Sequence, residues 1–401
     1  MNPESILNVL AGSSFGELIS KFAYMAHLPL TANRYGFNDR IQFQVHQTDA
    51  YTLPSQSYLL IKGQLEKMKD SDVQFADNGI AFLFEEIRYN MNYVEVDNTR
   101  SLGSATLLKG LASMTLNEYQ SSSNSGFAKL NELLDDHGNF SVCVPLKKWL
   151  GFFESYDKIV MSAKQELILQ RSTDDKSALY STKTPDTSKV KISDISWMLP
   201  YITVSDTIKL ALLPLIEKNS LIQVPFRAWE MIENTALNNV TRNNWTITTT
   251  TQLEKPRYVL VSFQTNRKNS MNVRNDKYDP VGLRDIKLFL NNEYYPYVNL
   301  NLNIATKEIS FLYEMYRSFQ YSYYHREDYV PALTRKSFLE DNFMIVFDCS
   351  FQNDSIQSGA VDVRLEIETT EAMPNGTVCQ CLIIHDKIFQ YSPFSGYIRR
   401  T

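Results

Sequence analysis

Apolar and polar residues alternate with a period of two over much of the chain. Ile41, Phe43 and Val45 are separated by polar residues, and residues 360–368 alternate in the same way. A strand points successive side chains to opposite faces, so the pattern is typical of strands with one buried face. Further strand-like stretches are residues 57–65, 79–96, 140–144, 159–170, 245–251, 257–264, 286–290, 294–302, 343–348, 378–384 and 388–391. The pattern predicts a mainly β protein.

Helical spacing of apolar residues occurs in fewer places. Residues 5–10 and 15–22 predict a short amphipathic arm over 1–36, whose apolar face would cover this chain or a neighbour. Residues 105–119 and 310–324 each predict one helix, so each half of the chain carries an inserted helix.

These landmarks recur in the same order after about half the chain length. An offset of 200 residues relates Tyr58-Leu59-Leu60-Ile61 to Tyr258-Val259-Leu260-Val261. Similar offsets relate residues 80–83 to 286–289, 93–94 to 297–298, and 140–142 to 343–345. Four matches in one order indicate two copies of a β-rich module.

The repeat predicts an all-β fold with a few inserted helices. Many short strands favour two face-to-face sheets of four strands, and an eight-stranded jelly roll fits the length of each copy. We therefore expect two tandem jelly rolls. The predicted divisions are a helical arm at 1–36, a first roll at 37–196, a connecting segment at 197–236 and a second roll at 237–401.

Composition excludes several classes of protein. Hydrophobic residues make up 43% of the chain and charged residues 21%, so the chain can bury a core and is not expected to be disordered. The net charge of −5 argues against binding nucleic acid by bulk charge. No apolar run is long enough for a membrane span, and the first residues show no secretory signal. Five Asn-x-Ser/Thr triplets are therefore interpreted as chance.

Cys379, Cys381 and His385 are the most suggestive group for a metal site. Zinc takes three or four Cys and His ligands, and only these three candidates lie together. The preferred interpretation is a strand with small buried cysteines. Cys349, between Asp348 and Ser350, could be a nucleophile, but the histidines are scattered and a buried cysteine is favoured.

Adjacent carboxylates and short basic clusters are interpreted as solvated surface. The carboxylate pairs are Glu85-Glu86 and Asp174-Asp175; neighbours on a strand face opposite ways and do not form an acid–base pair. The basic clusters are Lys147-Lys148, Arg267-Lys268, Arg274 and Arg399-Arg400. A patch touching packaged nucleic acid or a partner carboxylate is the alternative. The tyrosine-rich residues 313–324 suit core packing and interface packing equally.

Longer stretches resemble a known family. They are residues 144–175, 196–206, 224–230, 251–269, 289–303, 347–368 and 381–396. These are similar to the double jelly-roll major capsid proteins of Maverick/Polinton-like elements and adintoviruses, and the resemblance runs from about Asn38 to Arg400.

The resemblance implies a structural protein without catalytic residues, metal or cofactor. It implies homotrimeric, pseudo-hexagonal capsomers that tile an icosahedral shell. The expected partners are further copies of the chain, penton and other minor capsid proteins, and at most weakly the packaged DNA. The expected location is the virion, with synthesis in the host nucleus or cytoplasm left open.

Two other functions stay open at this point. One is a host protein co-opted from an integrated viral gene, which would keep the fold. The other is a β-sandwich carbohydrate binder or glycosidase, suggested by the tyrosine-rich segments. Three polar stretches, residues 98–104, 173–191 and 268–281, are expected to be long loops that form an outward tower or clasps between subunits.

Overall fold

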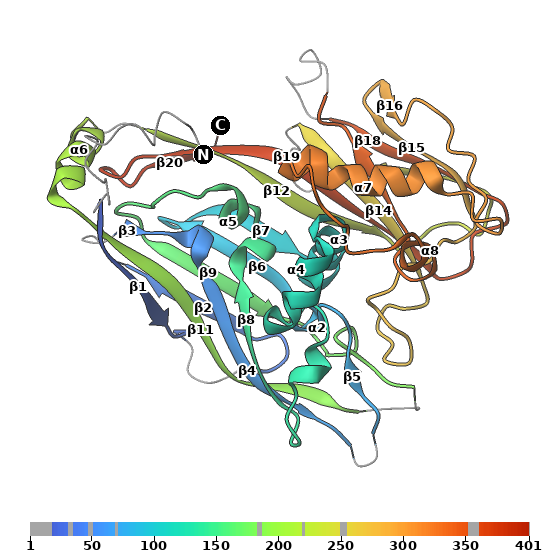
Figure 1. The fold of residues 1–401 in the computed structure, drawn as a ribbon, viewed down its shortest axis with the longest axis horizontal. Helices are drawn as coiled ribbons and strands as arrows, with labels where there is room; N and C mark the ends of the chain where they lie inside the picture. The colour runs from blue at the N-terminus through green and yellow to red at the C-terminus, as the bar shows by residue number, and fades with distance from the viewer. Residues whose placement is uncertain are drawn as a thin grey trace, which may run out of the picture.

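The computed structural model describes residues 18–30, 35–46, 51–68, 71–182, 187–218, 221–248, 255–351 and 361–400. The two halves of the chain form two β-rich units that lie side by side, with helices α3 and α4 where they meet (Figure 1).

The first unit consists of two antiparallel sheets. One has the strand order β1 (Ile19–His27), β11 (Lys189–Val204), β4 (Tyr58–Glu66) and β8 (Asn139–Pro145), with β3 (Tyr51–Thr52) also paired to β11. The other has the order β2 (Arg40–Val45), β9 (Gln165–Arg171), β6 (Phe84–Met91) and β7 (Val94–Arg100). A small ribbon joins β5 (Gln74–Phe75) to β10 (Leu179–Tyr180).

The second unit repeats both sheets in the same order. One sheet is β12 (Ile222–Asn234), β19 (Thr377–Tyr391), β14 (Pro256–Thr265) and β17 (Met344–Asp348), with β20 (Ile398–Arg400) beside β19. The other is β13 (Arg242–Ile247), β18 (Val363–Thr369), β15 (Leu283–Leu290) and β16 (Glu293–Tyr295). Two sheets of four core strands in each half confirm the predicted double jelly roll.

The helices fill the gaps between strands. They are α2 (Gly79–Phe82), α3 (Leu102–Ser113), α4 (Leu116–Gln120), α5 (Gly151–Ser155), α6 (Asp206–Glu217), α7 (Ser310–Tyr324) and α8 (Arg335–Glu340). Short 3₁₀ turns are η1 (Pro54–Gln56), η2 (Ser121–Ser125), η3 (Leu130–Leu133) and η4 (Leu146–Lys148). The two helices predicted from apolar spacing are confirmed as α3 with α4, and as α7.

The structure changes one correspondence within the repeat. Residues 79–82 form α2, so the strand equivalent to β15 is β6, one turn further along the chain. Asn78 causes the change: it adopts the left-handed conformation, and its buried side-chain amide donates to the Gly103 carbonyl and the Thr106 hydroxyl. Asparagine tolerates that conformation better than most residues, so the chain turns into a helix there.

The predicted helical arm is partly wrong. Residues 19–27 form strand β1, which pairs along β11 from Trp197 to Val204, while residues 1–17 lie outside the described part of the chain. Pairing with the sheet edge satisfies the backbone of β1, and a short apolar run does not distinguish a strand from a helix by spacing alone.

The loop expectation is also wrong for residues 98–104. Strand β7 runs to Arg100 and helix α3 begins at Leu102, whose side chain is fully buried. Residues 173–191 contain β10 and the start of β11, and residues 183–186 lie outside the described ranges. Only residues 268–281 form the long connection expected of them, between β14 and β15.

Candidate functional site: the junction between the rolls and an exposed strand

Helix α3 lies between the two rolls, which explains why nearly its whole surface is buried. It packs on β6 and β7 of the first roll and on α7, β12 and β19 of the second. Lys109 is in the middle of this helix and is 3% exposed. A buried ammonium group needs a counter-charge, and the surrounding elements supply one.

Lys109 and Glu154 form an ion pair at this junction. The Nζ atom of Lys109 lies 2.7 Å from Oε1 of Glu154, which is on α5 of the first roll. From the second roll, the hydroxyls of Tyr323 and Tyr324 donate to the same carboxylate at 2.9 and 2.6 Å. The Lys109 ammonium also lies 4.3 Å from the centre of the Trp229 ring. Burial lowers the pKa of Lys109, and the ion pair with Glu154 opposes that shift.

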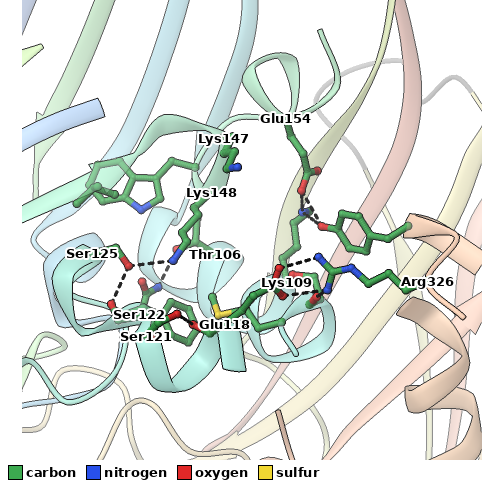
Figure 2. A pocket seen from close by; sticks show the side chains of 18 residues that line it. Thr106, Lys109, Glu118, Ser121, Ser122, Ser125, Lys147, Lys148, Glu154 and Arg326 are labelled. Carbon is green, nitrogen blue, oxygen red and sulfur yellow. Dashed lines mark hydrogen bonds and ion pairs between the residues drawn. The ribbon is translucent and has the colours of Figure 1, made fainter. Parts of the chain in front are cut away.

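A cavity of about 450 Å³ opens beside this ion pair (Figure 2). Arg326, just after α7, closes one side by donating two hydrogen bonds, 2.8 and 2.9 Å long, to the Glu118 carboxylate on α4. On the other side, the Nζ atom of Lys148 donates to the Ser125 hydroxyl at 2.9 Å. Burial would raise the pKa of Glu118, but the hydrogen bonds from Arg326 and Thr115 outweigh it and lower that pKa.

Residues 268–281 of the second roll reach across to the first roll. Arg274 pairs with Asp276 and lies 3.8 Å from a carboxylate oxygen of Asp77, while the Asp77 amide donates to Asp276 at 2.8 Å. The Tyr119 hydroxyl donates to Asp77 at 3.0 Å. Burial, together with the charge of Asp276, raises the pKa of Asp77. Residues 268–281, which were expected to form a tower or a clasp between subunits, thus form a contact between the two rolls of one chain.

Strand β1 exposes apolar side chains on both of its faces. Phe22, Tyr24 and Met25 are 42–43% exposed, and Leu28 and Leu30 just beyond are 67% and 59% exposed. β1 is the edge strand of its sheet and lies on the face of the first roll turned away from the second (Figure 1). An apolar sheet edge of this kind marks a surface suited to protein contact.

The cysteine candidates lie in the core. Cys379 and Cys381 are fully buried on β19, facing the same way, and burial raises the pKa of both thiols. His385 lies further along β19 and is also buried. Among the described residues, no three or more His, Cys, Asp and Glu side chains gather as a metal site would require. Burial raises the pKa of Cys349 as well, which is the reverse of what activates a cysteine nucleophile.

The paired carboxylates have different surroundings. Asp174, Glu85 and Glu86 lie at or near the surface, as expected. The interpretation is wrong for Asp175, which is 4% exposed and lies 2.6 Å from the Arg171 guanidinium. Arg171, four residues earlier in the chain, supplies the positive charge, so Asp175 is the partner in a buried ion pair.

The basic clusters are mostly paired within the chain. Arg267 pairs with Asp279, Lys268 with Glu233 and Arg274 with Asp276, whereas Lys148 lines the cavity and Lys147 lies at its rim. The tyrosine-rich helix α7 serves mainly the core: Tyr316, Phe319 and Tyr323 are buried, and Phe311 and Tyr321 remain exposed.

Sequence reasoning missed Asp97, a buried residue in the middle of β7. Its carboxylate accepts hydrogen bonds from the Phe152 and Asn98 amides, at 2.9 and 3.0 Å, and so positions α5 and with it Glu154. Burial raises the pKa of Asp97 to about 6, against the ordinary 3.8. A lone aspartate in a strand gives no local signal of this role.

We expect this carboxyl group to make folding depend on pH. As the pH rises above 3.8, the unfolded chain releases the proton first, so the folded state loses stability until the pH passes about 6. The unfolding free energy of the wild type minus that of Asp97→Asn should therefore fall by about 2 kcal/mol between pH 4 and pH 7. Urea unfolding of both proteins at several pH values measures it. A gap that stays constant would contradict the assignment.

The model of the double jelly roll-like domain matches residues 73–389. This range includes strands β5 to β11 of the first roll and nearly all of the second roll. The chain belongs to this double jelly-roll family.

Three solved structures show the same fold over nearly the full length. The Faustovirus major capsid protein has 8% identity, covers 96% of this chain and 93% of its own, and gives a TM-score of 0.62. The mavirus major capsid protein has 12% identity, with coverage of 98% and 92% and a TM-score of 0.59. A chain of the Sputnik virophage structure has 10% identity, with coverage of 100% and 92% and a TM-score of 0.65. No curated protein matches the sequence.

A helix that crosses a lipid bilayer must be both long and predominantly apolar. No helix in the described ranges of the chain meets both conditions.

Proposed function

We propose that this chain is a viral major capsid protein whose copies associate into pseudo-hexagonal homotrimers that tile an icosahedral shell. The observation that carries the proposal is the double jelly roll itself, shared over nearly the full length with the Faustovirus and mavirus major capsid proteins. Two similar modules in one chain give a trimer six similar modules around its axis, which matches a hexagonal outline.

Strand β1 is proposed as part of the surface through which copies meet. Apolar side chains on both of its faces, Phe22 and Tyr24 on one and Met25 on the other, are exposed to water in the isolated chain. Association would bury them, and burial of apolar area is the main favourable contribution to protein association. Helix α6 adds Leu210 and Leu213, which are 66% and 42% exposed.

The purified chain should have a native mass three times its 46.3 kDa and form hexagonal particles or closed shells in negative-stain images. The variant Phe22→Lys with Met25→Lys should lose the trimer and run as a monomer, because it places two charges in the proposed contact. Mass photometry measures both species. The unfolding midpoint of the variant should stay close to that of the wild type, since both side chains are substantially exposed.

Val330→Lys is the matched control, because Val330 is an apolar side chain, 62% exposed, on the second roll away from β1. It should leave the native mass unchanged. Equal loss of the trimer in both variants would reject the role of β1. A wild-type chain that stays monomeric at every concentration would reject the capsid proposal itself.

The finer identity is proposed on the sequence resemblance. We place the chain with the capsid proteins of Maverick/Polinton-like elements and adintoviruses, acting without enzymatic activity in the virion. Penton and other minor capsid proteins are its proposed further partners, with at most weak contact to DNA. On the strand positions, we propose that the first roll extends from β1 through β11, the second begins at β12, and α6 connects them.

A further inference from the structure

The cavity between the rolls carries more positive than negative charge. Its charged lining consists of Lys109, Lys147, Lys148 and Arg326 against Glu118 and Glu154. Both carboxylates already have a cationic partner, Lys109 for Glu154 and Arg326 for Glu118. Neither Lys147 nor Lys148 makes an ion pair with a carboxylate in the described part of the chain. Two positive charges at this cavity are therefore not compensated.

Lys148 is the residue that most needs a partner. Its ammonium group has three N–H donors, and among the described residues it donates a hydrogen bond to the Ser125 hydroxyl at 2.9 Å. Burial lowers its pKa to about 8; the charge of Glu118 opposes this shift and that of Lys147 adds to it. Figure 2 shows Lys148 projecting toward Ser125, while the Lys109–Glu154 and Arg326–Glu118 pairs lie on the other side of the cavity.

We propose that this cavity binds a small anion carrying a phosphate group, held by Lys148 with Lys147 at the rim. Phosphate groups are negatively charged at neutral pH and would compensate the charges of Lys147 and Lys148, and their oxygens accept hydrogen bonds from several directions. The volume of about 450 Å³ lies in the range of small-molecule sites. This inference does not depend on the proposed capsid function.

Binding would also connect the two rolls. Lys148 lies on η4 of the first roll and Arg326 follows α7 of the second, so the cavity that the anion would occupy is lined by both units. Because a ligand that binds only the folded state stabilises it, thermal unfolding of the whole chain should shift upward as the anion is added.

The probe is inorganic tripolyphosphate, titrated into the full chain by calorimetry at pH 7 and constant ionic strength. We expect saturable binding of one anion per chain. Lys148→Met should weaken affinity about tenfold, the scale of one charge-assisted hydrogen bond, and Lys148→Arg should restore it. Lys158→Met is the matched control, because Lys158 is exposed, lies in the same stretch and does not line the cavity. Its affinity should equal that of the wild type.

The pH dependence gives a second, independent readout. Lys148 loses its proton as the pH passes about 8, so wild-type affinity should fall between pH 7 and pH 9. Lys148→Arg keeps its charge throughout and should not show this fall. The other charged groups around the site are Lys147, Glu118, Lys109, Glu154 and Arg326, and they are the same in both proteins. A merely structural Lys148 would change the unfolding midpoint without this difference.

Three results would overturn the proposal: no saturable binding of tripolyphosphate, equal weakening in Lys148→Met and Lys158→Met, or binding of a short oligothymidylate in place of tripolyphosphate. The last would indicate a nucleic-acid surface. ATP forms the second arm, since tighter binding of ATP than of tripolyphosphate identifies a nucleotide as the source of the phosphate, and equal binding identifies the free anion.

Discussion

Replacing Arg171 by Met should destabilise the first roll by about 3–5 kcal/mol, the range measured when one partner of a buried ion pair is removed. Arg171 is 1% exposed at the end of β9. Its guanidinium lies 2.6 Å from Asp175 and donates to the Leu83 carbonyl at 2.6 Å. The substitution leaves the Asp175 carboxylate buried without its counter-charge. Urea unfolding followed by tryptophan fluorescence measures the loss, because Trp149 and Trp197 are buried in this roll.

Two further variants distinguish the cost of leaving the Asp175 charge buried from the cost of lost packing around Arg171. Asp175 also accepts a hydrogen bond from the Val190 amide at 2.8 Å, and Asn in its place keeps an acceptor there. Arg171→Met with Asp175→Asn should therefore be more stable than Arg171→Met alone. Arg242→Met, at a pair on the surface where Arg242 is 78% exposed, should cost no more than about 0.5 kcal/mol. A double variant as unstable as the single one would reject the ion-pair account.

The alternation of apolar and polar residues predicts the strands that have one solvent-exposed and one buried face. β18 is the clear example, since Val363, Leu365 and Ile367 are buried and the residues between them are not. The same alternation in both halves revealed the repeat, and the repeat revealed the double jelly roll. Strand β1 was not predicted because both of its faces are exposed in the isolated chain, so its apolar residues do not alternate with polar ones.

The junction between the rolls could not be read from local pattern. Lys109 and Glu154 are 45 positions apart, and the tyrosines that complete their network come from α7, about 170 positions further along. Pairing over such distances depends on how the rolls dock, and no spacing rule encodes it. For the same reason the sequence predicts a solvated surface position for Lys148, although the packing of α4 and η2 around it creates a cavity.

Gly151→Ala should be the second severe substitution, because it tests how closely the rolls approach. Gly151 begins α5, which packs on β12 of the second roll. A Cβ atom there would lie 2.9 Å from the carbonyl carbon of Arg227 and overlap its oxygen. Backbone of a strand paired along its length cannot yield as a flexible side chain would, so the rolls must separate locally, at a cost of about 3 kcal/mol.

Glycine 36 provides the comparison. A Cβ atom at Gly36, which is exposed, would meet only the Asp39 side chain, at 3.2 Å, and that side chain can move. Gly36→Ala should therefore change the unfolding free energy by no more than about 0.5 kcal/mol. Since α5 also carries Glu154, Gly151→Ala should displace that carboxylate from Lys109. The losses of unfolding free energy caused by Gly151→Ala and by Lys109→Met should therefore not add in the double variant. Full additivity would mean that close backbone contact and the ion pair hold the rolls together independently.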